Sequence, residues 1–303
     1  MTSPADDRAP RAFGLARMKP GQADCGLCGL SAPMTKAHVP AQMAGNGPTV
    51  RRARYVSKLR STEGKERFVE LGRAADGGLW VYGLCDPCNR VIQAPFEIRY
   101  KELAAMFKGL WNRDLTLSVP SPVTVPDVIF HPGAVARAVV IGMYAMNPAL
   151  RGLYPQLADT LGNGDAKIVL PPDLKLRLAI ARGRGARIAG GGGGLVIGQT
   201  TAGKPVGIIS FGSIYFPPLA WQFVASDAAP LLDRQGWADV SNWLEIDPAD
   251  ERLFSTVCTT SLPLAMHPTH DPAFRHTWIE LGVPGSSESV ECANLPSNLL
   301  GKL

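Results

Sequence analysis

Cysteine is scarce in this sequence, and six residues in 303 cannot form the dense disulfide framework on which small secreted domains depend. The first residues also lack a positively charged segment followed by an apolar core, so they give no secretory signal. We therefore expect a cytoplasmic, reducing location. Clustered cysteines in such an environment are typical of metal sites.

Uncharged apolar stretches of membrane-spanning length are almost absent as well. Residues 206–225 come closest, but Pro217-Pro218 interrupts them, and β-branched and aromatic residues are frequent there. We expect two buried strands that meet at the prolines, and no membrane partner.

Charge is distributed unevenly along the chain. Residues 1–118 carry 18 Lys and Arg against 11 Asp and Glu, a net charge of +7, whereas residues 119–303 carry a net charge of −2. A basic first part indicates a polyanionic partner such as DNA. The alternative interpretation is an ordinary solvated basic surface.

Three prolines within residues 119–126 suggest a domain boundary. We expect a flexible tail over residues 1–20, a first domain over residues 21–118, and a mixed domain of unknown role over residues 119–303. The predicted fold class is α+β, with a mainly antiparallel sheet in the second domain. Residues 119–303 leave open a protein partner or a homo-oligomeric interface.

Apolar patterning predicts the elements of both domains. In the first, strands at 67–71 and 79–84 are joined by a turn around Asp76-Gly77-Gly78, and a helix spans 95–111. In the second, a helix spans 132–146, and strands follow at 167–170, 174–180, 195–199 and 206–216. The glycines of 190–194 lack the ending of a phosphate loop, so we expect a flexible hairpin loop there.

Two Cys-x2-Cys pairs are the strongest signal in the chain: Cys25 with Cys28, and Cys85 with Cys88. Each pair places two thiolates on one tight turn, and two pairs complete a tetrahedral zinc site. The long insertion between the pairs adds only about 1 kcal/mol of loop-closure entropy, whereas structural zinc contributes on the order of 10 kcal/mol. Four thiolates leave no open coordination position, so this zinc is expected to be structural. Two unrelated turns, or a redox pair, are the alternatives.

The cysteine pairs occur together with two further motifs, Thr35-Lys36-Ala37-His38-Val39-Pro40 and Leu84-Cys85-x2-Cys88-Asn89. This ordered set, followed by a helix, resembles the HNH endonuclease family of the ββα-metal class, which has a treble-clef zinc fold. The resemblance covers about residues 22–110 and implies hydrolysis of DNA phosphodiester bonds with a divalent cation, magnesium or manganese.

The resemblance also assigns roles to three residues. His38 would be the general base that activates water, and Asn89 would orient the segment bearing His38. Glu97 would bind the cation. Relatives usually carry Asp or Glu directly before the catalytic His, but this chain has Ala37. Either the cation rests on fewer ligands, Glu97 with Asp86 for example, or the site is inactive. The alternative function is a non-catalytic zinc module that recruits DNA or a protein.

Other residues have weaker claims. Basic side chains in the insertion between the cysteine pairs are candidates for phosphate contact, namely Arg51, Arg52, Arg54, Lys58 and Arg60. A histidine cluster with nearby cysteines allows a second metal site, but its prolines favour a surface loop; its members are His267, His270, His276, Cys258 and Cys292. Four tryptophans are expected to pack in the core rather than to stack on bases: Trp221, Trp237, Trp243 and Trp278.

Overall fold

The computed structural model of the protein describes most of the chain. The described residues are 20–47, 53–56, 67–70, 77–110, 122–164, 166–182, 185–199, 205–225, 236–265 and 291–294. The tail expected over residues 1–20 lies outside this set except for Pro20. The fold is α+β as predicted, and every pairing between named strands is antiparallel.

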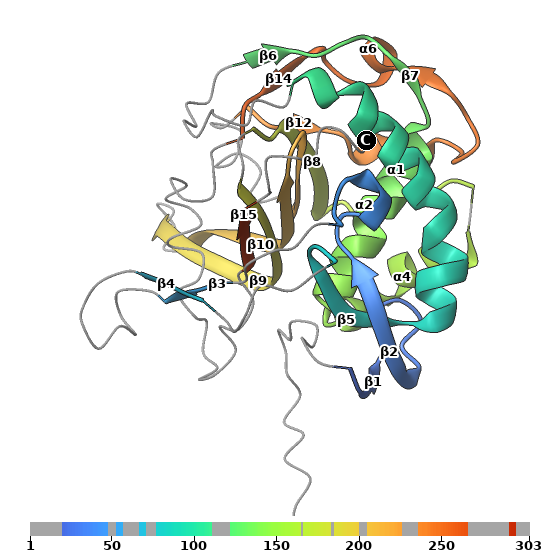
Figure 1. Cartoon of the computed structure of the whole chain (residues 1–303), viewed down its shortest axis with the longest axis vertical. Helices are drawn as coiled ribbons and strands as arrows, with labels where there is room; N and C mark the ends of the chain where they lie inside the picture. The colour runs from blue at the N-terminus through green and yellow to red at the C-terminus, as the bar shows by residue number, and fades with distance from the viewer. Residues whose placement is uncertain are drawn as a thin grey trace, which may run out of the picture.

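The first part of the chain forms a small sheet and a long helix (Figure 1). Its elements are β1 (Gln22–Asp24), β2 (Ser31–His38), η1 (Gln42–Ala44), β3 (Ala53–Val56), β4 (Arg67–Glu70), β5 (Trp80–Cys85), η2 (Pro87–Gln93), α1 (Ala94–Met106) and η3 (Lys108–Leu110). Strand β2 lies between β1 and β5 in a three-stranded sheet. The π-helical turn η2 runs directly into α1, so a helix begins almost at the end of β5.

The second part is built on a six-stranded sheet. Its elements are β6 (Pro122–Thr124), β7 (Ile129–Phe130), α2 (Pro132–Met146), α3 (Leu150–Leu153), α4 (Pro155–Asn163), β8 (Leu174–Ile180), β9 (Gly185–Gln199), β10 (Pro205–Phe216), β11 (Leu219–Ala225), β12 (Ala238–Asp239), η6 (Ser241–Glu245), β13 (Arg252–Leu253), α6 (Phe254–Val257), β14 (Ser261–Pro263) and β15 (Glu291–Asn294). The strand order is β12-β8-β11-β10-β9-β15, and three strand pairs complete the fold: β13-β7, β14-β6 and β3-β4.

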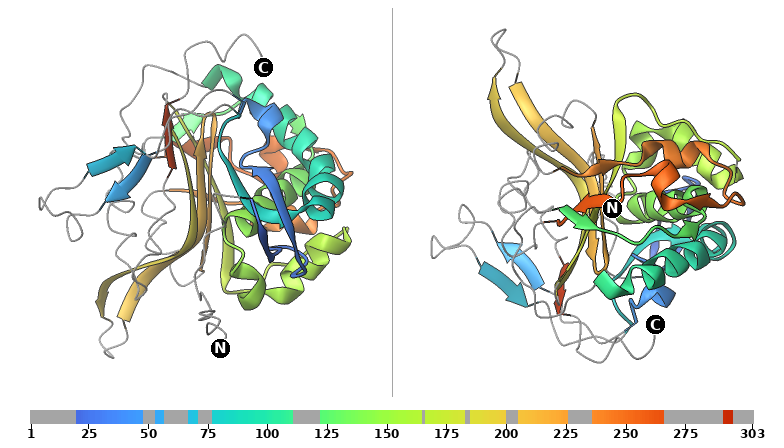
Figure 2. Two further views of the ribbon diagram at one scale, coloured as in Figure 1. Left: turned by 60° about the horizontal axis from the view of Figure 1, so that its bottom comes forward. Right: turned by 90° about the horizontal axis from the view of Figure 1, so that it is seen from above.

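Helix α2 is the centre of the molecule, and all 15 of its residues are buried. It contacts α1 and β5 as well as β9, β10 and β11, and Figure 2 shows the helices on one face of the six-stranded sheet. One hydrophobic core therefore includes residues from both sides of 119–126. Within it, the rings of Tyr100 and Trp221 lie 6.2 Å apart. The division into two domains stays a prediction.

Many of the expected elements are present. The predicted helix at 132–146 coincides with α2, and the strands at 174–180 and 206–216 correspond to β8 and β10. Strands β10 and β11 meet at Pro217-Pro218, as the composition of residues 206–225 predicts. No helix within the described residues is both long and apolar enough to span a membrane.

The pairing of the strands near residues 67–84 is not as expected. Strand β4 pairs with β3, and β5 pairs with β2, so the turn around Gly77 does not join two neighbouring strands. The prediction of a strand at 167–170 is also wrong. Ile168 donates one backbone hydrogen bond to Leu244 at 2.9 Å, and the prolines that follow at 171–172 lack the N–H groups that would extend a ladder.

The glycine run is part of a strand, not a hairpin loop. Strand β9 continues through residues 190–194 and pairs with β10, with Gly193 opposite Ser210 and Gly190 opposite Gly212. A side chain at Gly190 would collide with the carbonyl group of Met146 at the end of α2. The glycine at this position therefore permits the close approach of the central helix to the sheet.

Candidate metal centre and the adjoining cleft

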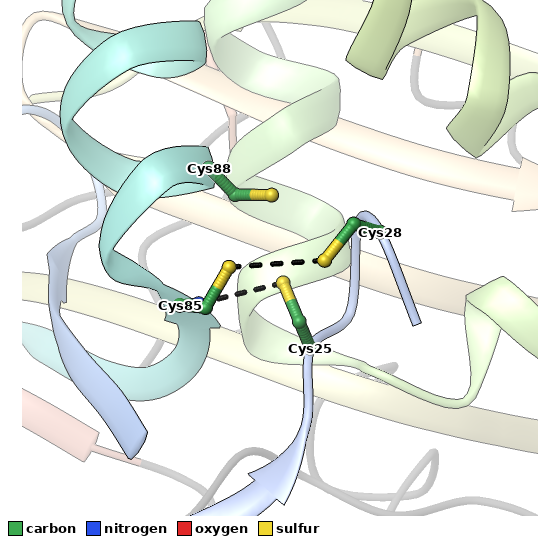
Figure 3. A group of neighbouring side chains, drawn as sticks. All are labelled: Cys25, Cys28, Cys85 and Cys88. Atoms are coloured by element: carbon green, nitrogen blue, oxygen red, sulfur yellow. Dashed lines mark hydrogen bonds between the residues drawn. The ribbon is translucent and has the colours of Figure 1, made fainter. Parts of the chain in front are cut away.

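The four cysteines of the two pairs converge on one point (Figure 3). Their sulfur atoms all lie within 4.8 Å of one another, and the Sγ atoms of Cys28 and Cys85 are 3.7 Å apart. This distance is far longer than a disulfide bond. It matches the separation of about 3.8 Å between sulfurs that bind one ion tetrahedrally at about 2.3 Å. The residues present therefore fit a metal ion with four thiolate ligands.

Local backbone geometry presents the sulfurs to one another. The N–H of Cys85 donates to Cys25 Sγ at 3.4 Å, and Gly29 turns the chain back after Cys28 with a φ of +76°. Gly26 cannot carry a side chain, because a Cβ there would collide with the carbonyl oxygen of Tyr144 in α2. The first pair is therefore fixed against the central helix as well as against the second pair.

The electrostatics of the cluster favour a charged sulfur. A hydrogen bond from the Cys88 thiol, with backbone N–H groups in addition, lowers the pKa of Cys25 to about 4. Its interaction with Cys25, together with burial, raises the pKa of Cys88 well above the usual value. A thiolate is the form of cysteine that binds metal ions. The lowered pKa of Cys25 thus favours the form of that side chain which binds a metal ion.

His38 ends strand β2 opposite Trp80, the first residue of β5, and its ring has a defined tautomer. The Nε2 atom lies 2.8 Å from the carbonyl oxygen of Gly77. Because a carbonyl oxygen can only accept, Nε2 carries the hydrogen and donates it, which leaves the lone pair of a neutral ring on Nδ1. Burial, together with the positive charge of Lys36, lowers the pKa of His38 below its usual value. His38 is therefore uncharged at neutral pH and able to accept a proton.

Asn89, the residue after the fourth cysteine, ties η2 to β2. Its Nδ2 atom donates to the carbonyl oxygen of Lys36 at 2.7 Å and to Oγ1 of Thr35 at 3.0 Å. The Thr35 hydroxyl in turn donates to the carbonyl oxygen of Leu84 in β5 at 3.1 Å. Both contacts of Asn89 lie within three residues of His38, so they fix the backbone from which the imidazole extends.

Glu97 and His38 both line a cleft of about 440 Å³. The cleft is lined by Lys36, His38, Gln42, Met43, Asn89, Arg90, Ala94 and Glu97. His38 and Glu97 also border a small cavity of about 10 Å³, which residues of α2 line as well. Burial raises the pKa of Glu97 to about 7. A half-buried carboxylate of this kind gains when a cation or a proton neutralises it.

The sequence analysis missed two basic residues of the cleft, Lys36 and Arg90. Lys36 lies two residues before His38 on the same strand, and side chains so spaced share one face; this signal was available. Arg90 lies in η2, one residue after Asn89, and its Nε forms an ion pair with Asp86 at 2.8 Å.

Ala37 and Asp86 do not line this cleft. Ala37 is fully buried, with 0% exposure, and it belongs to the hydrophobic core. A carboxylate here would therefore face the core rather than the cleft. Asp86 is exposed and paired with Arg90, so the structure does not bring it to Glu97 as a second cation ligand.

The basic insertion lies largely outside the described residues. Arg51, Arg52, Lys58 and Arg60 fall outside them, and only the backbone of Arg54, in β3, is described. Strands β3 and β4 lie across the six-stranded sheet from β2 (Figures 1 and 2). The described part of the insertion is thus apart from His38, and its contact with DNA stays a prediction.

The remaining candidates divide between the core and the undescribed segments. Trp221 and Trp243 are fully buried, with ring centroids 6.1 Å apart, as expected for core residues, and Trp237 packs on a smaller cluster. The residues His267, His270, His276 and Trp278, and the side chain of Cys292, lie outside the described set. Cys258 is a free, half-buried thiol whose pKa burial raises to about 11.

Comparisons of the chain with protein-family models, with curated proteins and with solved structures found no match.

Proposed function

We propose that the protein is a metal-dependent nuclease of the HNH type that hydrolyses DNA phosphodiester bonds in the cleft between β2 and α1. One observation carries the proposal. His38 is uncharged and held by the Gly77 carbonyl oxygen, with Nδ1 available, and it lines the same cleft as Asn89 and the carboxylate of Glu97. A base of suitable pKa beside a carboxylate is the arrangement that metal-assisted hydrolysis requires.

The cysteine cluster has a separate, structural part in this proposal. Cys25, Cys28, Cys85 and Cys88 would hold one zinc ion on a treble-clef scaffold, because four sulfur ligands without an open position are typical of structural zinc. In the second pair, Cys85 is the last residue of β5 and Cys88 lies in η2, directly before Asn89. A metal here would therefore fix the start of the helix that presents Asn89 and Glu97.

The chain's residues divide the hydrolytic step between them. Nδ1 of His38 takes a proton from water, whose oxygen forms a bond to phosphorus while the bond from phosphorus to the leaving oxygen breaks. Asn89 keeps the His38 backbone in place through Lys36, and Glu97 offers the carboxylate ligand for a magnesium or manganese ion. Such an ion, when bound, stabilises charge on the phosphate and on the leaving oxygen.

A second function is favoured by one observation: among the described residues that line this cleft, Glu97 alone is a carboxylate. Mg²⁺ is usually held by one or two carboxylates, with water and phosphate oxygens completing its octahedron. A site with a single carboxylate can bind DNA without cutting it. The alternative is thus a non-catalytic zinc module that recruits DNA or a protein.

A plasmid-nicking assay separates the two functions. The full chain is incubated with supercoiled plasmid and magnesium or manganese, beside the His38→Ala variant. We expect nicking by the parent, faster with manganese, and at least a hundredfold loss, in order of magnitude, on removal of the base. Thermal melting and zinc content of the variant show whether it is folded. No cleavage by a folded, zinc-loaded parent with either cation would favour the binding module.

A further inference from the structure

The side chain of Lys36 brings a positive charge into the cleft, and no carboxylate among the described residues pairs with it. Lys36 and His38 lie on the same face of β2 and both line the cleft, while Ala37 between them points into the core. Among the described residues Lys36 has no carboxylate partner, in contrast to Arg90, whose charge is paired with Asp86. Of the two basic side chains described in the cleft, Lys36 is therefore the one whose charge no carboxylate pairs.

An aromatic ring helps to hold the Lys36 side chain. Its Nζ lies 4.4 Å from the ring centroid of Trp80, close enough for a cation–π contact. Trp80 stands directly opposite His38 in the register of β2 and β5. The contact thus holds the ammonium near the imidazole without neutralising its charge, and an ammonium has three N–H donors, so donors remain for an anion.

The charge of Lys36 also affects the pKa of His38. The positive charge of Lys36 is one of the causes that lower the pKa of His38. Because Lys36 and His38 line the same cleft, an anion held by Lys36 would share that cleft with the imidazole. In the part of the chain that the structure describes, the charged groups lining the cleft are two basic side chains and one carboxylate, a balance that suits an anionic ligand.

We propose that Lys36 is a substrate-binding residue, whose ammonium contacts a non-bridging oxygen of the phosphodiester and places that phosphate beside Nδ1 of His38. The inference rests on the proposed function and deepens it. It means that the cleft binds the DNA backbone directly, and not only through a metal ion. A compact ammonium makes such a contact as a point charge, so the contact carries no preference for base sequence.

The test measures DNA binding without cleavage. A fluorescent duplex of about 30 base pairs is titrated with the full chain at several salt concentrations, without added magnesium or manganese and without a chelator that would remove zinc. For Lys36→Gln we expect the slope of log affinity against log salt to become shallower by about 0.9, the value for one lost phosphate contact. Affinity should fall alike for duplexes of different sequence.

Two variants serve as controls. Lys101→Gln removes an exposed lysine of α1 that does not line the cleft, and it should keep the slope of the parent. Lys36→Arg keeps the charge and should restore most of the slope, which a purely structural defect would not allow. In cleavage assays, Lys36→Gln should raise KM more than it lowers kcat.

The outcomes distinguish this inference from the proposed function. A parent that cuts DNA while Lys36→Gln keeps the full salt slope overturns the inference and leaves the nuclease standing. A parent that cuts nothing, yet loses its salt slope on Lys36→Gln but not on Lys101→Gln, supports the phosphate contact and overturns the nuclease. Equal loss of slope in Lys36→Gln and Lys101→Gln also overturns the inference, because the effect is then one of overall charge.

Discussion

The side-chain amide of Asn89 donates a hydrogen bond to the carbonyl oxygen of Lys36 at 2.7 Å. This bond joins the π-helical turn η2, in which Cys88 also lies, to strand β2, which ends at His38. Asn89→Asp keeps the size of the side chain but removes both N–H donors. We expect a loss of about tenfold to a hundredfold in kcat, typical of groups that orient a functional residue, with little change in zinc content or KM. The measurement is steady-state cleavage kinetics beside metal analysis, and an unchanged kcat would remove Asn89 from the proposed site.

The cysteine cluster predicts one zinc ion per chain in protein purified without chelator. Cys85→Ser should lower the free energy of unfolding by about 3 kcal/mol or more, because metal binding at such a site contributes to folding. Cys258→Ser is the matched control, since Cys258 lies outside the cluster and should leave the metal content unchanged. Elemental analysis and denaturant unfolding provide the measurements, and a zinc-free parent protein would exclude the assignment.

The pH dependence of cleavage should report His38. Burial and the charge of Lys36 lower its pKa below 6.5, so the basic, uncharged form predominates above that lowered pKa and is lost as the pH falls through it. At saturating manganese, the acid limb of the rate profile should therefore lie below about pH 6.5. Lys36→Gln removes one cause of the shift and should move the limb to higher pH. A limb that stays in place would mean that another group titrates.

Glu97 is expected to set the cation requirement. Glu97→Gln keeps the shape of the side chain but removes its charge, so the manganese concentration for half-maximal cleavage should rise about tenfold or more. Glu102→Gln on the same helix is the control, because Glu102 pairs with Arg99 and does not line the cleft. The measurement is cleavage rate against manganese concentration, and equal effects of the two substitutions would contradict the assignment.

The Ala37→Asp variant tests whether an acidic residue at position 37 can contribute to cation binding. Because Ala37 is fully buried in the core, Ala37→Asp should destabilise the protein by about 3 kcal/mol or more rather than improve cation binding. Ala37→Ser, a smaller polar change at the same position, should cost less. The measurements are thermal melting and the cation dependence of cleavage for the parent and both variants. A stable Ala37→Asp variant that cleaves at a lower cation concentration would show that the side chain can reach the cleft.

The sequence predicts the cysteine cluster well because each pair is local. Two residues on one turn share a ligand direction regardless of the surrounding fold, and only the meeting of the two turns depends on tertiary structure. The amphipathic and apolar patterns likewise predict α2, β8 and β10, since burial on one face or all around a helix leaves a periodic signal.

Structural features that depend on contacts between distant parts of the chain were not predicted from the sequence. Strand β3 pairs with β4 and β2 pairs with β5, although several other pairings were compatible with the sequence. The turn residues near Gly77 favoured joining the strands at 67–71 and 79–84, which do not pair. The glycines of β9 have the composition of a loop, and their strand conformation follows from the close approach of Met146 at the end of α2. Arg137 is fully buried within α2, where the carbonyl oxygens of Gly133, Ile246 and Ala166 accept its hydrogen bonds.

The contact between the cysteine-bearing segment and α2 has a consequence for synthesis of the protein. Side chains at Gly26 and Gly83 would collide with the carbonyl oxygens of Tyr144 and Ala145, so both glycines lie directly against a helix that is translated after them. The metal-binding turns and the strand preceding them therefore leave the ribosome before the surface that supports them exists. Under the proposed function, the cleft would become competent to cut nucleic acid only after residues 132–146, which form this supporting helix, have emerged.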